Sequence, residues 1–201
     1  MYLPTHFEET RLPVLHELVR SHPLGLLVTQ AETGMEVNAL PFLIDPERGP
    51  CGTLRDDAQA MVVFQGPQAY VSPGWYATKA ETGKVVPTWN YVLVQARGML
   101  KVMDDAAWVR RLVGELTERH ESSHARPWRV EDAPADYIDT MLRAIVGIEI
   151  ELGSLVGKWK VSQNRPAADR DGTAFGLDAQ GGEAARQMAR QVRDPGAPSQ
   201  P

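Results

Sequence analysis

Apolar residues near the start of the chain recur with the spacing of one helix face. Four of them lie on the same side of a helical projection: Leu12, Leu15, Leu18 and Val19. Thr10 can cap this segment, and Pro23 ends it because the residue before a proline avoids helical backbone angles. The pattern therefore predicts a helix over residues 10–21.

The next part of the chain is typical of strands joined by short connections. The candidate strands cover residues 24–30, 35–44, 51–54, 60–64 and 69–72. The longest strand signal covers residues 89–103, where Tyr91, Leu93 and Gln95 alternate with Val92, Val94 and Ala96. Gly98 interrupts this strand and indicates a bulge or a close approach of another backbone.

Two helices and a last strand complete the pattern. Asp104 is expected to cap a helix whose apolar side includes Trp108 and Leu112, and Pro134 opens a helix that runs through Arg143. Residues 145–152 then alternate as a strand. Since short connections dominate and no crossover helix separates the early strands, the order predicts an α+β fold with an antiparallel β-barrel core.

Composition sets the expected domain limits and the class of protein. Residues 1–177 are expected to form one domain, and the polar, glycine-containing residues 178–201 to form a disordered tail with at most a transient helix. The formal net charge of -5 argues against direct binding to DNA, which favours basic proteins. The single cysteine, Cys51, fits a reducing cytoplasm, and no apolar run reaches the length of about 20 residues that a membrane span needs.

No nucleotide-binding or hydrolase motif occurs, and His120 and His124 lack further metal ligands nearby, so we expect no catalytic set and no metal site. The segment KAETGKVVPTWNY, residues 79–91, is more informative. Lys84 and Thr88 can bind a phosphate, and Trp89 and Asn90 can contact a flat heteroaromatic ligand. The alternative is an ordered loop that closes a barrel, with Trp89 and Tyr91 in the core.

The segment GKWKVSQNR, residues 157–165, forms a basic patch in an acidic chain. Lys158, Lys160, Gln163 and Arg165 are candidates for a second wall that binds an anion or a ring, contributed in one arrangement by another subunit. The alternative is a solvent-exposed edge strand.

Several long motifs together resemble the PaiB family of FMN-binding negative transcriptional regulators. These are MYLPTHFEE, VVFQGPQAYVSPGWY, KAETGKVVPTWNYVLVQARG, DAPADYIDTMLRAIVGIEI and GKWKVSQNRPAADR, which cover roughly residues 1–177. The resemblance implies an antiparallel split β-barrel with flanking helices, similar to the pyridoxamine-phosphate oxidase superfamily. It also implies a homodimer with FMN at the subunit interface, and a role in control of sporulation and degradative enzymes in some bacteria.

The chain departs from the family pattern after Arg55, where about a dozen residues are missing before Ala60. Arg55 is a candidate remnant of the strand that contacts the flavin phosphate. Loss of this segment would make FMN binding weak or absent. Two other functions therefore stay open: a flavin-dependent oxidoreductase on the same barrel, and a cofactor-free barrel that binds a partner.

Overall fold

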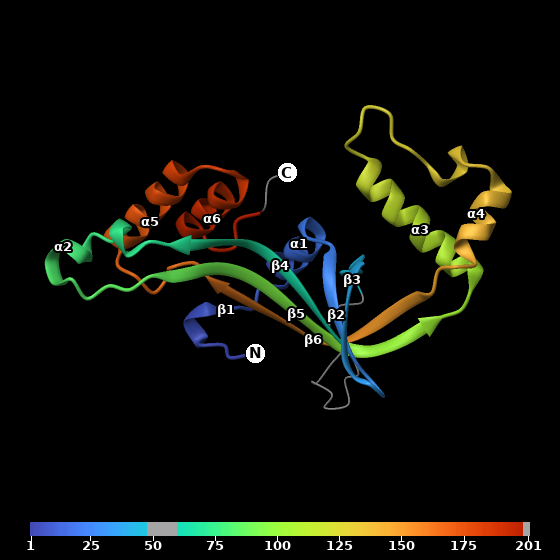
Figure 1. Ribbon diagram of the computed structural model, residues 1–201, viewed down its shortest axis with the longest axis horizontal. Helices are drawn as coiled ribbons and strands as arrows, with labels where there is room; N and C mark the ends of the chain where they lie inside the picture. The colour runs from blue at the N-terminus through green and yellow to red at the C-terminus, as the bar shows by residue number, and fades with distance from the viewer. Residues whose placement is uncertain (48–59, 199–201) are drawn as a thin grey trace.

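The computed structural model describes residues 1–47 and 60–198. Within them, six antiparallel strands form one sheet in the order β1-β6-β5-β4-β2-β3 (Figure 1). The strands are β1 (Glu8–Glu9), β2 (Leu24–Ala31), β3 (Gly34–Pro41), β4 (Ala60–Val71), β5 (Thr88–Met103) and β6 (Gly147–Lys160).

The long strand predicted over residues 89–103 is confirmed as β5, which pairs with β4 on one side and β6 on the other. The predicted irregularity at Gly98 is also confirmed, because the register with β6 shifts between Arg97 and Gly98. A Cβ atom on Gly98 would lie 2.0 Å from the Glu151 carbonyl oxygen, so a larger residue cannot fit there.

Several strand boundaries differ from the prediction. The two predicted strands over residues 60–64 and 69–72 are one strand, β4, which ends at Val71 and whose register shifts between Gln65 and Gln68. The last strand continues to Lys160 instead of ending at residue 152, because its pairing with β5 extends to Tyr91. The candidate strand over residues 51–54 lies outside the described residues.

Six α-helices and three short 3-10 turns accompany the sheet in the described ranges. They are η1 (Thr5–Phe7), α1 (Leu12–Ser21), η2 (Pro73–Trp75), α2 (Thr78–Thr82), α3 (Ala106–Glu121), η3 (Val130–Asp132), α4 (Ala135–Leu142), α5 (Ala167–Gln180) and α6 (Glu183–Arg193). Asp105, not Asp104, caps α3, since its carboxylate accepts from the backbone N–H groups of Ala107 and Trp108. No helix in these ranges is long and apolar enough to cross a membrane.

Helices α1, α5 and α6 cover one face of the sheet, whereas α3 and α4 lie together beyond its far end (Figure 1). The covered side, called the core face below, presents Val62, Phe64, Val92, Val94 and Trp159. These side chains belong to one buried cluster with Leu15 and Leu18 of α1 and Met188 of α6. Burial of this apolar surface is the main favourable contribution to folding.

The prediction of a disordered tail after residue 177 is wrong for α6. Its Ala185, Met188, Ala189 and Val192 are at most 5% exposed, and they pack on the core face. The segment looks polar by composition because its arginines lie on the opposite side of an amphipathic helix. The buried contacts offset the cost of ordering these residues.

Candidate functional site

The candidate site lies on the other side of the sheet, called the second face below. Strand pairing places β5 and β6 side chains opposite each other on this face, as Tyr91 with Lys160, Leu93 with Lys158, Gln95 with Val156 and Arg97 with Ser154. The segment 157–165 is therefore not an edge strand at its start, since β6 lies between β5 and β1.

Lys160 joins the two segments that the sequence singled out. Its Nζ donates to the Thr88 hydroxyl oxygen at 2.6 Å and to the carbonyl oxygen of Trp89. These residues are about 70 positions apart in the chain, and only the antiparallel pairing of β5 with β6 brings them together. Lys160 thus fixes the start of β5 beside the end of β6.

Lys158 is a buried cation, with only 7% of its surface exposed. Its Nζ donates to the Tyr2 carbonyl oxygen at 2.9 Å and lies 5.6 Å from the Tyr2 ring centroid and 5.4 Å from that of Tyr91. Aromatic faces stabilise a cation but do not neutralise it. Glu8 pairs with Lys158 through the backbone, but its exposed side chain forms no ion pair with Lys158.

Lys158, Lys160 and Arg165 form what is called the cation cluster below. Burial lowers the pKa of Lys160, and the charges of Lys158 and Arg165 lower it further. Among residues 1–47 and 60–198, no carboxylate forms an ion pair with any of the three. Three cations that form no ion pair with a described carboxylate favour an anionic ligand.

Arg165 lies over the ring of Tyr76, with its guanidinium carbon 4.7 Å from the ring centroid. Burial raises the pKa of Tyr76, an effect that Asp169 strengthens and Arg165 opposes. The Tyr76 hydroxyl is buried and has no hydrogen-bond partner in the described part of the chain. Asp169 instead accepts from the backbone N–H and hydroxyl of Thr78, which anchors α2 next to α5.

Trp89 continues the second face beyond Tyr91. It is 54% exposed and meets Tyr70 of β4, 45% exposed, in an edge-to-face contact with ring centroids 6.1 Å apart. Because Trp89 is exposed, it does not belong to the core. Its contact with a flat ligand stays a prediction. An exposed pair of rings beside a cation cluster can stack on a heteroaromatic group.

Three other candidates lie apart from this group, and a fourth lies outside the described residues. Asn90 faces the core side and exchanges hydrogen bonds with the Ser162 hydroxyl at 2.9 and 3.2 Å. Gln163 stabilises the turn after β6, because its side chain bonds to the backbone of Val161 and of Trp159. Lys84 is exposed in the loop after α2, and Arg55 lies outside the described residues.

The candidates did not include Arg97 and Ser154, which lie further along the second face. The signal for Arg97 was present, since Tyr91, Leu93 and Gln95 set an alternation that Arg97 continues. Ser154 could not be found in this way, because its position opposite Arg97 depends on the pairing of β6 with β5.

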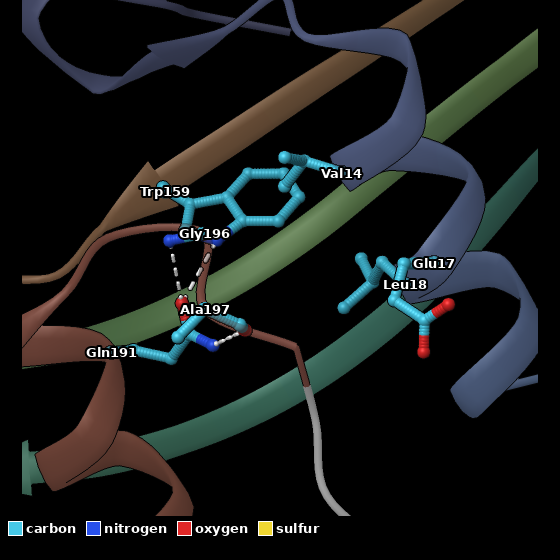
Figure 2. Close-up of a pocket in the computed structure, with 7 residues that line it drawn as sticks. All are labelled: Val14, Glu17, Leu18, Trp159, Gln191, Gly196 and Ala197. Atoms are coloured by element: carbon cyan, nitrogen blue, oxygen red, sulfur yellow. Dashed lines mark hydrogen bonds between the residues drawn. The ribbon is translucent and has the colours of Figure 1, made fainter.

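A small pocket on the core side is a less suitable site (Figure 2). It is lined by Val14, Glu17, Leu18, Trp159, Gln191, Gly196 and Ala197. Two of its polar side chains already bond within it, since the Gln191 side chain accepts from the Trp159 indole at 3.1 Å and donates to the Ala197 carbonyl oxygen at 2.7 Å. Among the described residues its lining includes the acidic Glu17 and no lysine or arginine, so it does not suit an anionic ligand.

Comparison with known proteins gives one family. The family model described as "Putative FMN-binding domain" matches residues 1–154. An uncharacterized protein of Emericella nidulans is 30% identical, and the alignment covers 98% of each chain. That alignment runs over 245 positions, more than the 201 residues of this chain, so this chain is shorter than the fungal relative.

One further relative and one solved structure are also similar to this chain. The protease synthase and sporulation protein PAI 2 of Bacillus subtilis is 25% identical, with 96% of this chain and 97% of that protein covered. The crystal structure of a conserved hypothetical protein from Mycobacterium tuberculosis matches with a TM-score of 0.53 at 14% identity, over 83% of this chain and 94% of that one. The predicted fold class, an α+β fold of the FMN-binding split-barrel type, is confirmed.

Proposed function

Because the chain belongs to the FMN-binding domain family, we propose that it binds FMN, with the phosphate held by the cation cluster. The observation that carries this proposal is the meeting of Lys158, Lys160 and Arg165 without a paired carboxylate in the described ranges. A flavin phosphate carries nearly two negative charges, and charge-assisted hydrogen bonds to it are the strong ones. The residues present therefore fit this group.

Thr88 and Trp89 complete the proposed site. Lys160 donates to the Thr88 oxygen, which leaves the Thr88 hydroxyl hydrogen free to donate to a phosphate oxygen. The exposed Trp89 ring offers a flat surface next to the phosphate position. Bound FMN supplies redox chemistry, and the protein holds it in place and controls its surroundings.

We further propose that two copies of the chain associate through the second face. Apolar side chains of β2 and β3 on this face are exposed: Leu24 by 64%, Leu26 by 43%, Met35 by 71% and Val37 by 60%. A contiguous apolar surface of this kind marks an interaction site. A second copy would cover it and would lie next to the FMN site, as the family resemblance implies.

The biological role that fits best is PaiB-like regulation in which the flavin is the ligand. Similarity to the PAI 2 protein over nearly the whole chain supports it. The net charge of -5 favours regulation without tight direct binding to DNA. The single cysteine supports a cytoplasmic setting.

The experiment is an FMN titration of the purified protein, followed by fluorescence quenching and absorbance. We expect saturable binding at one site per chain with a dissociation constant in the micromolar range, since the segment after Arg55 is short. A parallel titration with riboflavin, which lacks the phosphate, is expected to show at least about tenfold weaker binding. Absence of binding, or equal binding of FMN and riboflavin, would contradict the proposal.

A further inference from the structure

A second polar group lies on the second face, further along the same strands. Arg97 of β5 pairs with Ser154 of β6, and both side chains point to this face. Ser154 is 9% exposed, and its hydroxyl has no hydrogen-bond partner within the described ranges. Buried hydroxyl groups are nearly always bonded, so an unbonded one requires an explanation.

Arg97 adds a charge beside this hydroxyl. Its side chain is half-buried, and no carboxylate in residues 1–47 and 60–198 forms an ion pair with it. A guanidinium removed from water without a partner costs free energy. Arg97 and Ser154 together therefore offer several donors to a group that is not part of the described chain.

The distance between this pair and the cation cluster suits one elongated ligand. Ser154 and Lys158 are four positions apart on β6, which corresponds to roughly 13 Å along the strand. Between them lie Leu93, Gln95 and Val156. This half-exposed stretch of sheet is a mainly apolar floor on which a flat ring can lie.

Resting on the FMN binding proposed above, we infer that Arg97 and Ser154 bind the pyrimidine edge of the isoalloxazine ring while the cation cluster holds the phosphate of the same molecule. The five-carbon ribityl chain of FMN connects these two parts. Arginine and lysine side chains are long enough to adjust to its length. The arrangement places a positive charge where the reduced flavin carries negative charge, near N1 and the adjacent carbonyl oxygen.

This position of Arg97 has a consequence for the redox properties of the site. A guanidinium next to N1 binds the reduced, anionic flavin more tightly than the neutral oxidised ring. By linkage, the midpoint potential of bound FMN is raised relative to a site without this charge. The site therefore favours reduced FMN, which suits a redox enzyme or a redox sensor.

The test compares Arg97→Gln, Arg97→Lys and Ser154→Ala with the wild-type protein. The control is Arg126→Gln, which removes an exposed arginine between α3 and α4. Dissociation constants are measured for oxidised FMN and, after reduction with dithionite without oxygen, for reduced FMN. Thermal unfolding without flavin shows whether each variant is folded.

In Arg97→Gln we expect binding of oxidised FMN to weaken by less than about threefold and binding of reduced FMN by about tenfold or more. The ratio of the two dissociation constants then changes by more than about threefold, which corresponds to a midpoint potential lower by at least about 15 mV for a two-electron couple. Arg97→Lys is expected to retain most of the preference, and the control all of it. Ser154→Ala, a small change that keeps the fold, is expected to weaken binding of both forms by about threefold to tenfold.

The results separate this inference from the proposed function. If the wild-type protein binds no FMN, both fail. If it binds FMN but the ratio is unchanged in Arg97→Gln, and Ser154→Ala binds normally, only the inference fails. Loss of the dimer in Arg97→Gln with an unchanged ratio would likewise overturn it, since Arg97 would then pair with a second copy.

Discussion

Successive residues of β5 point to two faces with opposite surroundings. On the core face, Val92 and Val94 are fully buried under α1 and α6. On the second face, the neighbouring Trp89 is half exposed, and Tyr91 lies next to the ammonium groups of Lys158 and Lys160. The same strand therefore stabilises the fold with one set of side chains and presents ligand-binding chemistry with the other.

Because the two faces differ in this way, substitutions on the core face should affect stability, and substitutions on the second face should affect ligand binding. A buried apolar side chain cannot be removed without loss of packing. Charged groups that form no ion pair contribute little to stability or oppose it, so a ligand better explains their presence on the second face.

The largest effect is expected from Trp159→Ala on the core face. Trp159 is 3% exposed, and its removal should lower the free energy of unfolding by about 3–5 kcal/mol. The matched control is Trp89→Ala on the second face, for which we expect a loss below about 1 kcal/mol. Urea denaturation of both variants measures the difference, and equal losses would contradict this expected difference between the two faces.

Association of two copies is tested by Leu26→Lys on β2. A lysine in an apolar interface is expected to weaken the dimer by about a hundredfold or more, because two copies of the charge would be buried. Leu12→Lys on α1 is the control, since both leucines are 43% exposed. Light scattering at micromolar concentration should give the dimer mass for the control and the monomer mass for Leu26→Lys. A wild-type protein that is already monomeric would remove the basis for this prediction.

Lys160→Gln should weaken FMN binding by about 10-fold to 100-fold, because it removes one charge-assisted hydrogen bond to the phosphate. Lys84→Gln, which changes an exposed lysine outside the cluster, is expected to change binding by less than about twofold. Fluorescence titration measures both. Similar losses in the two variants would show that net charge, not the cluster, controls binding.

The smallest effect concerns pH. Because the pKa of Lys160 is lowered in the folded protein, the folded state releases this proton before the unfolded state does. Stability of the wild-type protein relative to Lys160→Gln should therefore rise as the pH increases from the lowered pKa towards 10.5. FMN affinity should fall over the same range, because a neutral amine attracts the phosphate less. If the free energies of unfolding of the two proteins change in parallel across this pH range, the prediction that the Lys160 ammonium is destabilised in the folded state is wrong.

The sequence by itself determined the strand over residues 89–103, the irregularity at Gly98 and the helix after residue 10. These features depend on local patterns, since side-chain alternation and backbone limits act between near neighbours. The same alternation assigned Tyr91 and Gln95 to one side of the strand and Val94 to the other. It also identified Thr88, Lys158 and Lys160 as candidates by residue type.

Only the tertiary structure decided which of these candidates meet. Pairing of β5 with β6 joins Lys160 to Thr88, places Asn90 on the core side and brings Ser154 opposite Arg97. Helix α6 forms for a related reason: its Met188 and Val192 are too few to indicate a core element by composition, and the core face of the sheet gives them a surface to cover. Contacts between distant segments depend on strand register and on the shape of both partners, and neither is encoded in the pattern of one segment alone.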